Sequence, residues 1–240
     1  MKQTHQLELE VNAQPNDTTC GPTCLHAVYR YFGDEVPLQQ LIGQIRTLPG
    51  GGTLAVELGC HALARGYRAA IYTYNLQVFD PTWFEPGVDL PAKLREQEAL
   101  KQDLKLSIAT EAYLRFLDGG GELRYDPLDA RLIRRILRKD LPILTGLSAT
   151  YLYGCAREDD VDYHDVRGVP QGHFVVVSGY DHEAKLVRVA DPQHDNPLTA
   201  TPYYDVAISQ LIGAIFLGIV TYDANLLVIA PRGRGPRRLP

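Results

Sequence analysis

Hydrophobic residues in the first part of the chain recur three or four positions apart, which predicts amphipathic helices. The first predicted helix begins near Cys20 and carries Leu25 and Val28 on its apolar face. Pro22 falls in the first turn, where a missing N–H costs little, and Gly33 is expected to end the helix. Three residues before it offer N-cap oxygens: Asp17, Thr18 and Thr19.

Glycines mark the boundaries of the next predicted elements. The loop "LPGGGT" (48–53) follows a second short helical stretch, and Thr53 is expected to cap a third helix over residues 54–65. Gly66 should end that helix, since glycine favours the C-terminal position. The apolar run that follows, residues 67–75, predicts a strand.

The middle of the chain has a weaker pattern. Residues 90–121 are expected to form one or two helices with a mixed surface, closed by a glycine turn. The stretch "DPLDARLIRRILRKD" (126–140) predicts a helix with Asp126 as a possible cap and an exposed basic face.

In the second half, the pattern changes to runs of β-branched residues. Strands are predicted over residues 141–149, 172–181 and 185–192, and the apolar run 211–231 is expected to form two buried strands around a turn. Helices first and antiparallel strands later indicate an α+β protein. We expect one domain with two lobes over residues 1–230, followed by a tail over 231–240.

Composition and charge narrow the classes of protein. The 240 residues are 45% hydrophobic and 22% charged, as in ordinary globular proteins, and the net charge of −5 gives no reason to expect a nucleic-acid partner. The arginines of the tail are interpreted as part of a solvated extension. The first ten residues lack the apolar stretch of a secretory signal, and polar residues interrupt the run 211–231, so we expect no membrane span and a cytoplasmic location.

The four cysteines are too few and too irregularly placed for a disulfide framework: Cys20, Cys24, Cys60 and Cys155. Cys20 could pack in the core, share a metal with Cys24, or act as a nucleophile. No second Cys or His pair follows at zinc-site spacing, and His26 would point away from Cys24, which we expect to lie in the core. At a helix N-terminus the macrodipole and free N–H groups favour a thiolate, and Gly21 would leave room for a substrate.

The stretch from Gly172 to Pro192 ("GHFVVVSGYDHEAKLVRVADP") predicts a hairpin, with two β-branched runs around a polar turn. If the hairpin is symmetric about His182, then His173 and Asp191, each nine positions away, lie opposite one another. A carboxylate there can hold the imidazole by one ring nitrogen and leave the other for a thiol. A slip of one residue would break this pairing.

Taken together, "QPNDTTCGPTC" (14–24), "GHFVVVSGY" and "ADP" resemble the catalytic motifs of papain-like cysteine peptidases. They are most similar to the branch that processes bacteriocin and peptide precursors at double-glycine leaders, and to its stand-alone relatives. In that branch a Gln precedes the Cys by six positions, as Gln14 precedes Cys20, and the acid lies in an Asp-Pro, as Asp191 does. The resemblance covers about residues 14–72 and 130–193, and leaves 75–125 as a possible helical insertion.

The resemblance implies a two-lobe fold, with the Cys on a helical lobe and the His and Asp on an antiparallel sheet. It implies Cys20 as nucleophile, His173 as its proton partner and Asp191 as the group that orients the imidazole. Gln14 would donate to the oxyanion. The implied activity is hydrolysis of a peptide or protein substrate without a metal or cofactor. The loop "LPGGGT" lacks the Lys of a phosphate-binding loop, so a stand-alone peptidase is expected.

Two alternatives stay open at this point. The same scaffold could pass the acyl group to an amine as an acyltransferase, or could merely hold a peptide without catalysis. His164, Asp165 and His194 are interpreted as loop residues. The sequence defines neither the cleavage specificity nor the oligomeric state.

Overall fold

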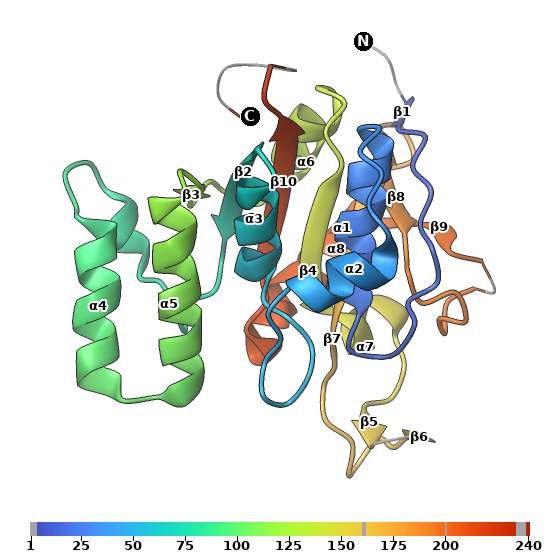
Figure 1. The fold of residues 1–240 in the computed structure, drawn as a ribbon. Coiled ribbons are helices and arrows are strands. Elements are labelled where there is room, and N and C mark those ends of the chain that lie inside the picture. The colour runs from blue at the N-terminus through green and yellow to red at the C-terminus, as the bar shows by residue number, and fades with distance from the viewer. Residues whose placement is uncertain (1–3, 160–161, 200, 234–238) are drawn as a thin grey trace.

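The computed structural model describes residues 4–159, 162–199, 201–233 and 239–240. In these residues an eight-stranded sheet is covered by helices on both faces (Figure 1). The strand order is β3-β2-β10-β4-β7-β8-β9, and β1 pairs with β7 outside this path. All the pairings of this sheet are antiparallel except the parallel pair β2 and β3.

The sheet takes strands from both halves of the chain. Its strands are β1 (Thr4–Gln6), β2 (Tyr67–Thr73), β3 (Glu122–Arg124), β4 (Ile143–Ser148), β7 (Gly172–Asp181), β8 (Leu186–Ala190), β9 (Tyr203–Ala207) and β10 (Asn225–Pro231). A separate two-stranded ribbon joins β5 (Glu158–Asp159) and β6 (Asp162–Tyr163).

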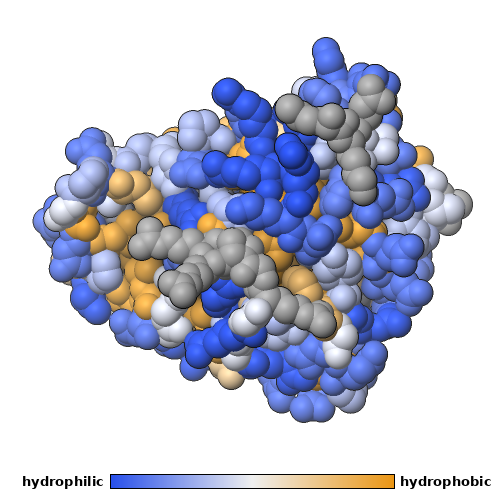
Figure 2. Space-filling model, turned by 90° about the horizontal axis from the view of Figure 1, so that it is seen from above, coloured by the Kyte–Doolittle hydropathy of each residue, from blue (hydrophilic) through white to orange (hydrophobic). Residues whose placement is uncertain are grey.

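The helices lie on the two faces and at one side of the sheet (Figure 1). They are α1 (Cys20–Tyr31), α2 (Leu38–Gln44), α3 (Ala55–Ala64), α4 (Leu90–Lys101), α5 (Leu104–Asp118), α6 (Ala130–Leu137), α7 (Ala149–Tyr153) and α8 (Ile208–Leu217), with 3-10 turns η1 (Pro81–Phe84) and η2 (Gly218–Thr221). The pair α4 and α5 forms an antiparallel hairpin beside α3. Seen from above, hydrophobic side chains reach the surface on that side (Figure 2).

Two hydrophobic cores lie on opposite faces of the sheet. Along β7, Phe174 and Val176 join the core that includes α1 and α3, while Val175 and Val177 join the core that includes α6 and α8. This alternation follows from the two-residue period of a strand. Because both faces are covered, a central strand such as β10 is buried over almost its whole length, which explains why its sequence reads as a nearly continuous apolar run.

Most of the predicted elements of the first half are confirmed. Helix α1 begins at Cys20, α3 is followed by Gly66 with a φ of 89°, and β2 follows at Tyr67. The segment 90–121 forms two helices and a glycine turn. The expected α+β fold is confirmed, although β2 and β10 show that the two halves share one sheet.

The prediction of two strands over residues 211–231 is wrong in its first part, which forms α8 and η2. Leu211, Ala214 and Ile215 are fully buried at helical spacing. A short run that is apolar all round cannot be assigned by period alone, and here packing on the sheet selects the helix. Within the described residues, none of the helices combines the length and apolar character that a bilayer crossing requires.

Two predicted caps are also wrong. Thr53 donates its hydroxyl to the carbonyl of Arg46 at 2.9 Å instead of capping α3. Helix α6 is capped by Asp129, whose carboxylate accepts from two backbone N–H groups, whereas Asp126 pairs with Arg135. At α1, Thr19 occupies the N-cap without a side-chain cap hydrogen bond.

The register of the β7–β8 hairpin differs from the symmetric prediction. Val176 pairs with Ala190, and the register shifts between Val177 and Gly179. Continued beyond the end of β8, this register places Asp191 opposite Val175 rather than opposite His173. The displacement is two residues, so both side chains remain on the same face of the sheet.

The interpretation of the C-terminal segment as wholly solvated is wrong for its last two residues. Leu239 is only 3% exposed and packs in the core that includes α6 and α8. Arg124 of β3 donates to the carbonyl oxygens of Leu239 and Pro240. Residues 234–238, with most of the tail arginines, lie outside the described residues.

A buried carboxylate lies at the edge of the core between η2 and β10. Asp223 is 6% exposed and accepts a hydrogen bond from the Thr221 hydroxyl at 2.9 Å. Burial raises its pKa to about 7, although the Thr221 bond and the charges of Lys105 and His173 oppose the shift. A Cβ at Gly172 would lie 2.7 Å from Asp223 Oδ2, so glycine is required there for close packing.

This shift predicts a pH-dependent stability difference. The pKa of Asp223 is higher in the folded chain than in the unfolded one, so its contribution lowers the free energy of unfolding as pH rises from about 4 to about 7. We expect Asp223→Asn to be more stable than the parent at about pH 8, on the order of 2 kcal/mol in urea denaturation, and the difference to vanish near pH 4. Asp118→Asn, at an exposed carboxyl, is the control. A difference that is equal at both pH values would contradict the prediction.

Candidate active site

Cys20 is the first residue of α1, and this end of the helix packs against β7. The side chain is 7% exposed and belongs to the core between α1 and the sheet. The sequence suggested that Gly21 leaves room for a substrate, but in the structure the space beside Gly21 is filled by other side chains of the protein. A Cβ there would lie 2.6 Å from the Thr53 methyl group and would press against Phe174. Gly21 therefore lets the start of α1 approach the rest of the core.

Cys24 lies in the core, as expected. It is fully buried and its thiol donates to the Phe174 carbonyl at 3.2 Å. Burial raises the pKa of Cys24 well above its ordinary value, and the charges of Cys20 and Asp191 act in the same direction. In the parts of the chain that the structure describes, no three His, Cys, Asp or Glu side chains are grouped so that they could hold a metal ion.

His173 is the second residue of β7, and its ring is almost completely buried. The Nε2–H group donates to Asp191 Oδ1 at 2.8 Å. The Cys20 side chain lies close enough to the ring to help raise the pKa of His173. Because Nε2 is engaged by Asp191, Nδ1 is the nitrogen left for the sulfur. The imidazole therefore bridges the helix and the sheet.

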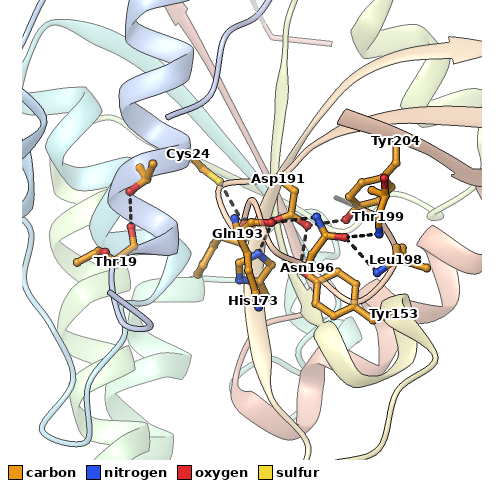
Figure 3. Close-up of polar contacts among 12 residues, drawn as sticks. Thr19, Cys24, Tyr153, His173, Asp191, Gln193, Asn196, Leu198, Thr199 and Tyr204 are labelled. Atoms are coloured by element: carbon orange, nitrogen blue, oxygen red, sulfur yellow. Dashed lines mark hydrogen bonds and ion pairs between the residues drawn. The ribbon is translucent and has the colours of Figure 1, made fainter. Parts of the chain in front are cut away.

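Asp191 follows the last residue of β8 and is fully buried. Its Oδ1 accepts from His173 and from the backbone N–H of Gln193 at 2.9 Å. Its Oδ2 accepts from the hydroxyls of Tyr153 at 2.8 Å and Tyr204 at 2.6 Å. Figure 3 shows the carboxylate between the imidazole and the two tyrosines. Four donors thus compensate the lost hydration of one charge.

The charges of this cluster stabilise one another. Burial alone disfavours an imidazolium, but the charge of Asp191, the hydrogen bond to it and the contact with Cys20 raise the pKa of His173 to about 10. Burial also disfavours the carboxylate, but His173, Tyr204 and the Gln193 N–H hold the pKa of Asp191 below its ordinary value. The pair is therefore ionised at neutral pH.

Tyr153 and Tyr204 are the site residues that the sequence analysis missed. Tyr153 ends α7, a short helix that starts directly after β4 with Ser148 as its N-cap. Tyr204 lies on β9, the neighbour of β8 in the sheet. Burial and the nearby Asp191 charge raise the pKa of both hydroxyls, so both are protonated donors. Nothing in their local sequence distinguishes them from other tyrosines of the chain.

Gln14 lies in the segment between β1 and α1, on the wall of a cleft of about 340 Å³ that His173 also lines. Its backbone N–H donates to the Pro192 carbonyl at 2.9 Å, which ties this segment to the residue after Asp191. Among the described residues its side-chain Oε1 is enclosed without a hydrogen-bond partner. The structure therefore brings Gln14, Cys20, His173 and Asp191 into one region.

The three other polar residues near the motifs are loop residues, as predicted. His164 accepts from the backbone N–H groups of Val166 and Arg167 in the turn after β6. Asp165 belongs to the same turn. His194 follows Gln193 and has an enclosed Nε2 without a partner among the described residues.

The middle helices α4 and α5 were not covered by the motifs. The start of α5 lies near the start of β7, the strand that carries His173. The Lys105 ammonium at the start of α5 lies 4.4 Å from the centre of the Tyr222 ring, next to Asp223. A second cavity, of about 520 Å³, separates this start from the glycine loop 48–51. Gly51 of that loop approaches the Thr18 methyl group so closely that a Cβ would lie 2.8 Å from it. The start of α5 thus lies across this cavity from the loop that packs against Thr18, in the segment that leads into Cys20.

Comparisons with known proteins give matches at the level of structure alone. No protein-family model matches the sequence, and no curated protein matches it significantly. A structure of a C39-like peptidase from Bacillus anthracis is similar at 15% identity, over 95% of this chain and 98% of that chain, with a TM-score of 0.53. This likeness shows the fold alone and agrees with the papain-like α+β fold expected from the motifs.

Two further structures align with a TM-score of 0.45 each. One is a double glycine motif protease from an AMS/PCAT transporter in complex with the leader peptide, at 14% identity over 95% of this chain and 94% of that chain. The other is Xylellain, a cysteine protease from Xylella fastidiosa, at 14% identity over 96% of this chain and 87% of that chain.

The hydrogen bonds to Asp191 predict a stability effect. Tyr153→Phe and Tyr204→Phe each remove one donor to the buried carboxylate, so each should lower the free energy of unfolding by about 1–3 kcal/mol at neutral pH. The losses should not add, because both hydroxyls bind the same oxygen. Urea denaturation of the two single variants and the double variant measures this. Tyr151→Phe, an exposed tyrosine of the same helix, should change nothing, and equal effects at all three tyrosines would refute the assignment.

Proposed function

We propose that the protein is a cysteine peptidase that hydrolyses a peptide or amide bond with Cys20 as the nucleophile. The observation that carries the proposal is the continuous chain of contacts from Asp191 through His173 to Cys20. It combines a thiol at a helix start, an imidazole that bridges two elements and a buried carboxylate. A nucleophile, a base and a group that orients the base are the three parts of covalent acyl transfer.

The first half of the reaction forms a thioester. The pKa of about 10 keeps His173 protonated at neutral pH, so it can pair with a Cys20 thiolate. The thiolate attacks the carbonyl carbon, and the C–N bond breaks as the imidazolium gives its Nδ1 proton to the leaving amine. Asp191 compensates the positive charge and holds the ring in one orientation by its bond to Nε2.

The second half releases the acid. Water attacks the thioester and gives a proton to the now neutral imidazole, and the C–S bond breaks to restore the thiolate and the imidazolium. In both halves a negative charge develops on the carbonyl oxygen. The Gln14 amide, on the wall of the same cleft as His173, and the Cys20 backbone N–H are the proposed donors to it.

Selective alkylation tests the nucleophile. We expect Cys20 alone to react quickly with iodoacetamide near neutral pH, because burial is the main factor that raises the pKa of each of the other three thiols, to about 11 for Cys60. His173→Ala should slow the labelling of Cys20 about tenfold or more. Peptide mass mapping of the alkylated chain gives the rate at each thiol.

The matched control is His182→Ala, at an exposed histidine of the β7–β8 turn, which should leave the rate at Cys20 unchanged. Slow and equal labelling of all four cysteines in the parent would overturn the proposal.

A second variant separates thiol activation from oxyanion binding. Alkylation has no oxyanion, so Gln14→Ala should label at the parental rate while its rate of peptide cleavage falls about 100- to 1,000-fold. Cleavage of a peptide library, followed by mass spectrometry of the products, measures the second quantity. A parallel fall in both rates would assign Gln14 a structural role instead.

A further inference from the structure

The cleft beside His173 is acidic. Three carboxyl groups line it together with His173 and Gln14: Asp17, Glu158 and Asp162. They come from two separate segments, the loop before α1 and the β5–β6 ribbon. No lysine or arginine belongs to this wall among the described residues. The wall therefore carries three carboxyl groups, and its one cationic group is the His173 imidazolium, which is paired with Asp191.

These carboxylates are not neutralised by their neighbours. In the described residues none of the three makes an ion pair with a lysine or arginine. The two arginines closest in sequence are engaged elsewhere: Arg167 pairs with Asp159 at 3.0 Å, and Arg157 donates to the carbonyls of Asp165 and Val166. A ligand cation would therefore meet no lysine or arginine of the described residues already paired with these carboxylates.

The charges act on one another across the cleft. Burial raises the pKa of Glu158, the charge of Asp17 raises it further, and the positive charge of His173 opposes the shift. Asp17 and Glu158, which are far apart in the sequence, are thus close enough to repel each other. A cation between them would relieve this repulsion.

The position of His173 indicates which part of a substrate occupies the cleft. The imidazolium must give its proton to the leaving amine, so the residues that follow the cleaved bond must lie on the His173 side of Cys20. The cleft is formed on that side by the start of β7 and by Gln193, the second residue after Asp191. It is therefore placed to receive the chain that leaves, rather than the acyl part.

We propose that this cleft selects substrates with a lysine or arginine within the first three residues after the cleaved bond. The proposal rests on the proposed function and adds the substrate class. Tyr163, on the same wall, offers an aromatic face for the side-chain stem or the cation. An extended peptide advances about 3.3 Å per residue, and a long basic side chain lets the charge reach the carboxylates from any of these positions.

Cleavage of a peptide library by the full chain tests the proposal. A cellular proteome is first digested to peptides whose terminal residues are not restricted to one type. These peptides are incubated with the protein, and new termini are identified by mass spectrometry. Termini that also form with Cys20→Ser are discarded. We expect lysine and arginine to be enriched on the order of tenfold over aspartate and glutamate just after the bond, and the enrichment to fall as salt is raised.

Three variants assign the preference to the cleft. The triple variant Asp17→Asn, Glu158→Gln, Asp162→Asn should lose most of the enrichment, measured on the termini that it still forms beyond the level of Cys20→Ser. A control with the same change in net charge, Glu8→Gln, Glu85→Gln, Asp118→Asn at exposed positions, should retain the enrichment. Glu158→Lys, which leaves Asp17 and Asp162 in place, should weaken it more than Glu158→Gln does. Circular dichroism melting of each variant checks the fold, and the single Glu158→Gln replaces the triple if that one is unstable.

The outcomes separate the two proposals. Cys20-dependent cleavage with no basic preference, or with a preference that the triple variant keeps, would overturn the inference and leave the peptidase intact. A library left uncut beyond the level of Cys20→Ser would overturn both. Loss of the preference in the triple variant, and a larger loss in Glu158→Lys than in Glu158→Gln, support the inference.

Discussion

The arrangement of the site depends on one buried charge, the carboxylate of Asp191. A carboxylate removed from water is costly unless donors replace its hydration, and here four donors surround it. With the charge compensated in this way, the adjacent imidazole can remain protonated in the protein interior. Without the charge at Asp191, burial would disfavour the imidazolium, and the thiol at the start of α1 would face a neutral ring.

The fold supplies these donors from separate parts of the sheet. His173 begins β7, Tyr153 ends the short helix after β4, and Tyr204 lies on β9. Strands β4, β7, β8 and β9 are consecutive in the sheet, so three connections that differ in length deliver their side chains to one point. Cys20 comes from α1, which covers one face of this sheet and packs across β7. Packing in both cores therefore fixes the contact between the thiol and the ring.

The sequence predicted the pair His173 and Asp191 better than it predicted the hairpin that joins them. The assumed register of the hairpin was wrong by two residues. A shift of two keeps both side chains on one face of the sheet, so His173 and Asp191 still meet as diagonal neighbours and form a hydrogen bond. This pair could be predicted because the two-residue period of a strand and the Asp-Pro dipeptide that follows it are local features of the sequence. Tyr153 and Tyr204 could not be found in this way, because only the strand order brings them to Asp191. The helix α8 was missed since an apolar run has no period to read.

Two buried carboxylates flank the start of β7, and their environments assign them opposite states. Asp191 accepts four hydrogen bonds and has a lowered pKa, whereas the side chain of Asp223, packed against Gly172, accepts one from a hydroxyl and has a pKa raised to about 7. The positive charge of His173 lowers the pKa of both carboxyl groups, but only Asp191 makes a hydrogen bond with the ring. The choice of counter-ion therefore follows from the number of donors around each carboxylate, not from proximity to the imidazole alone.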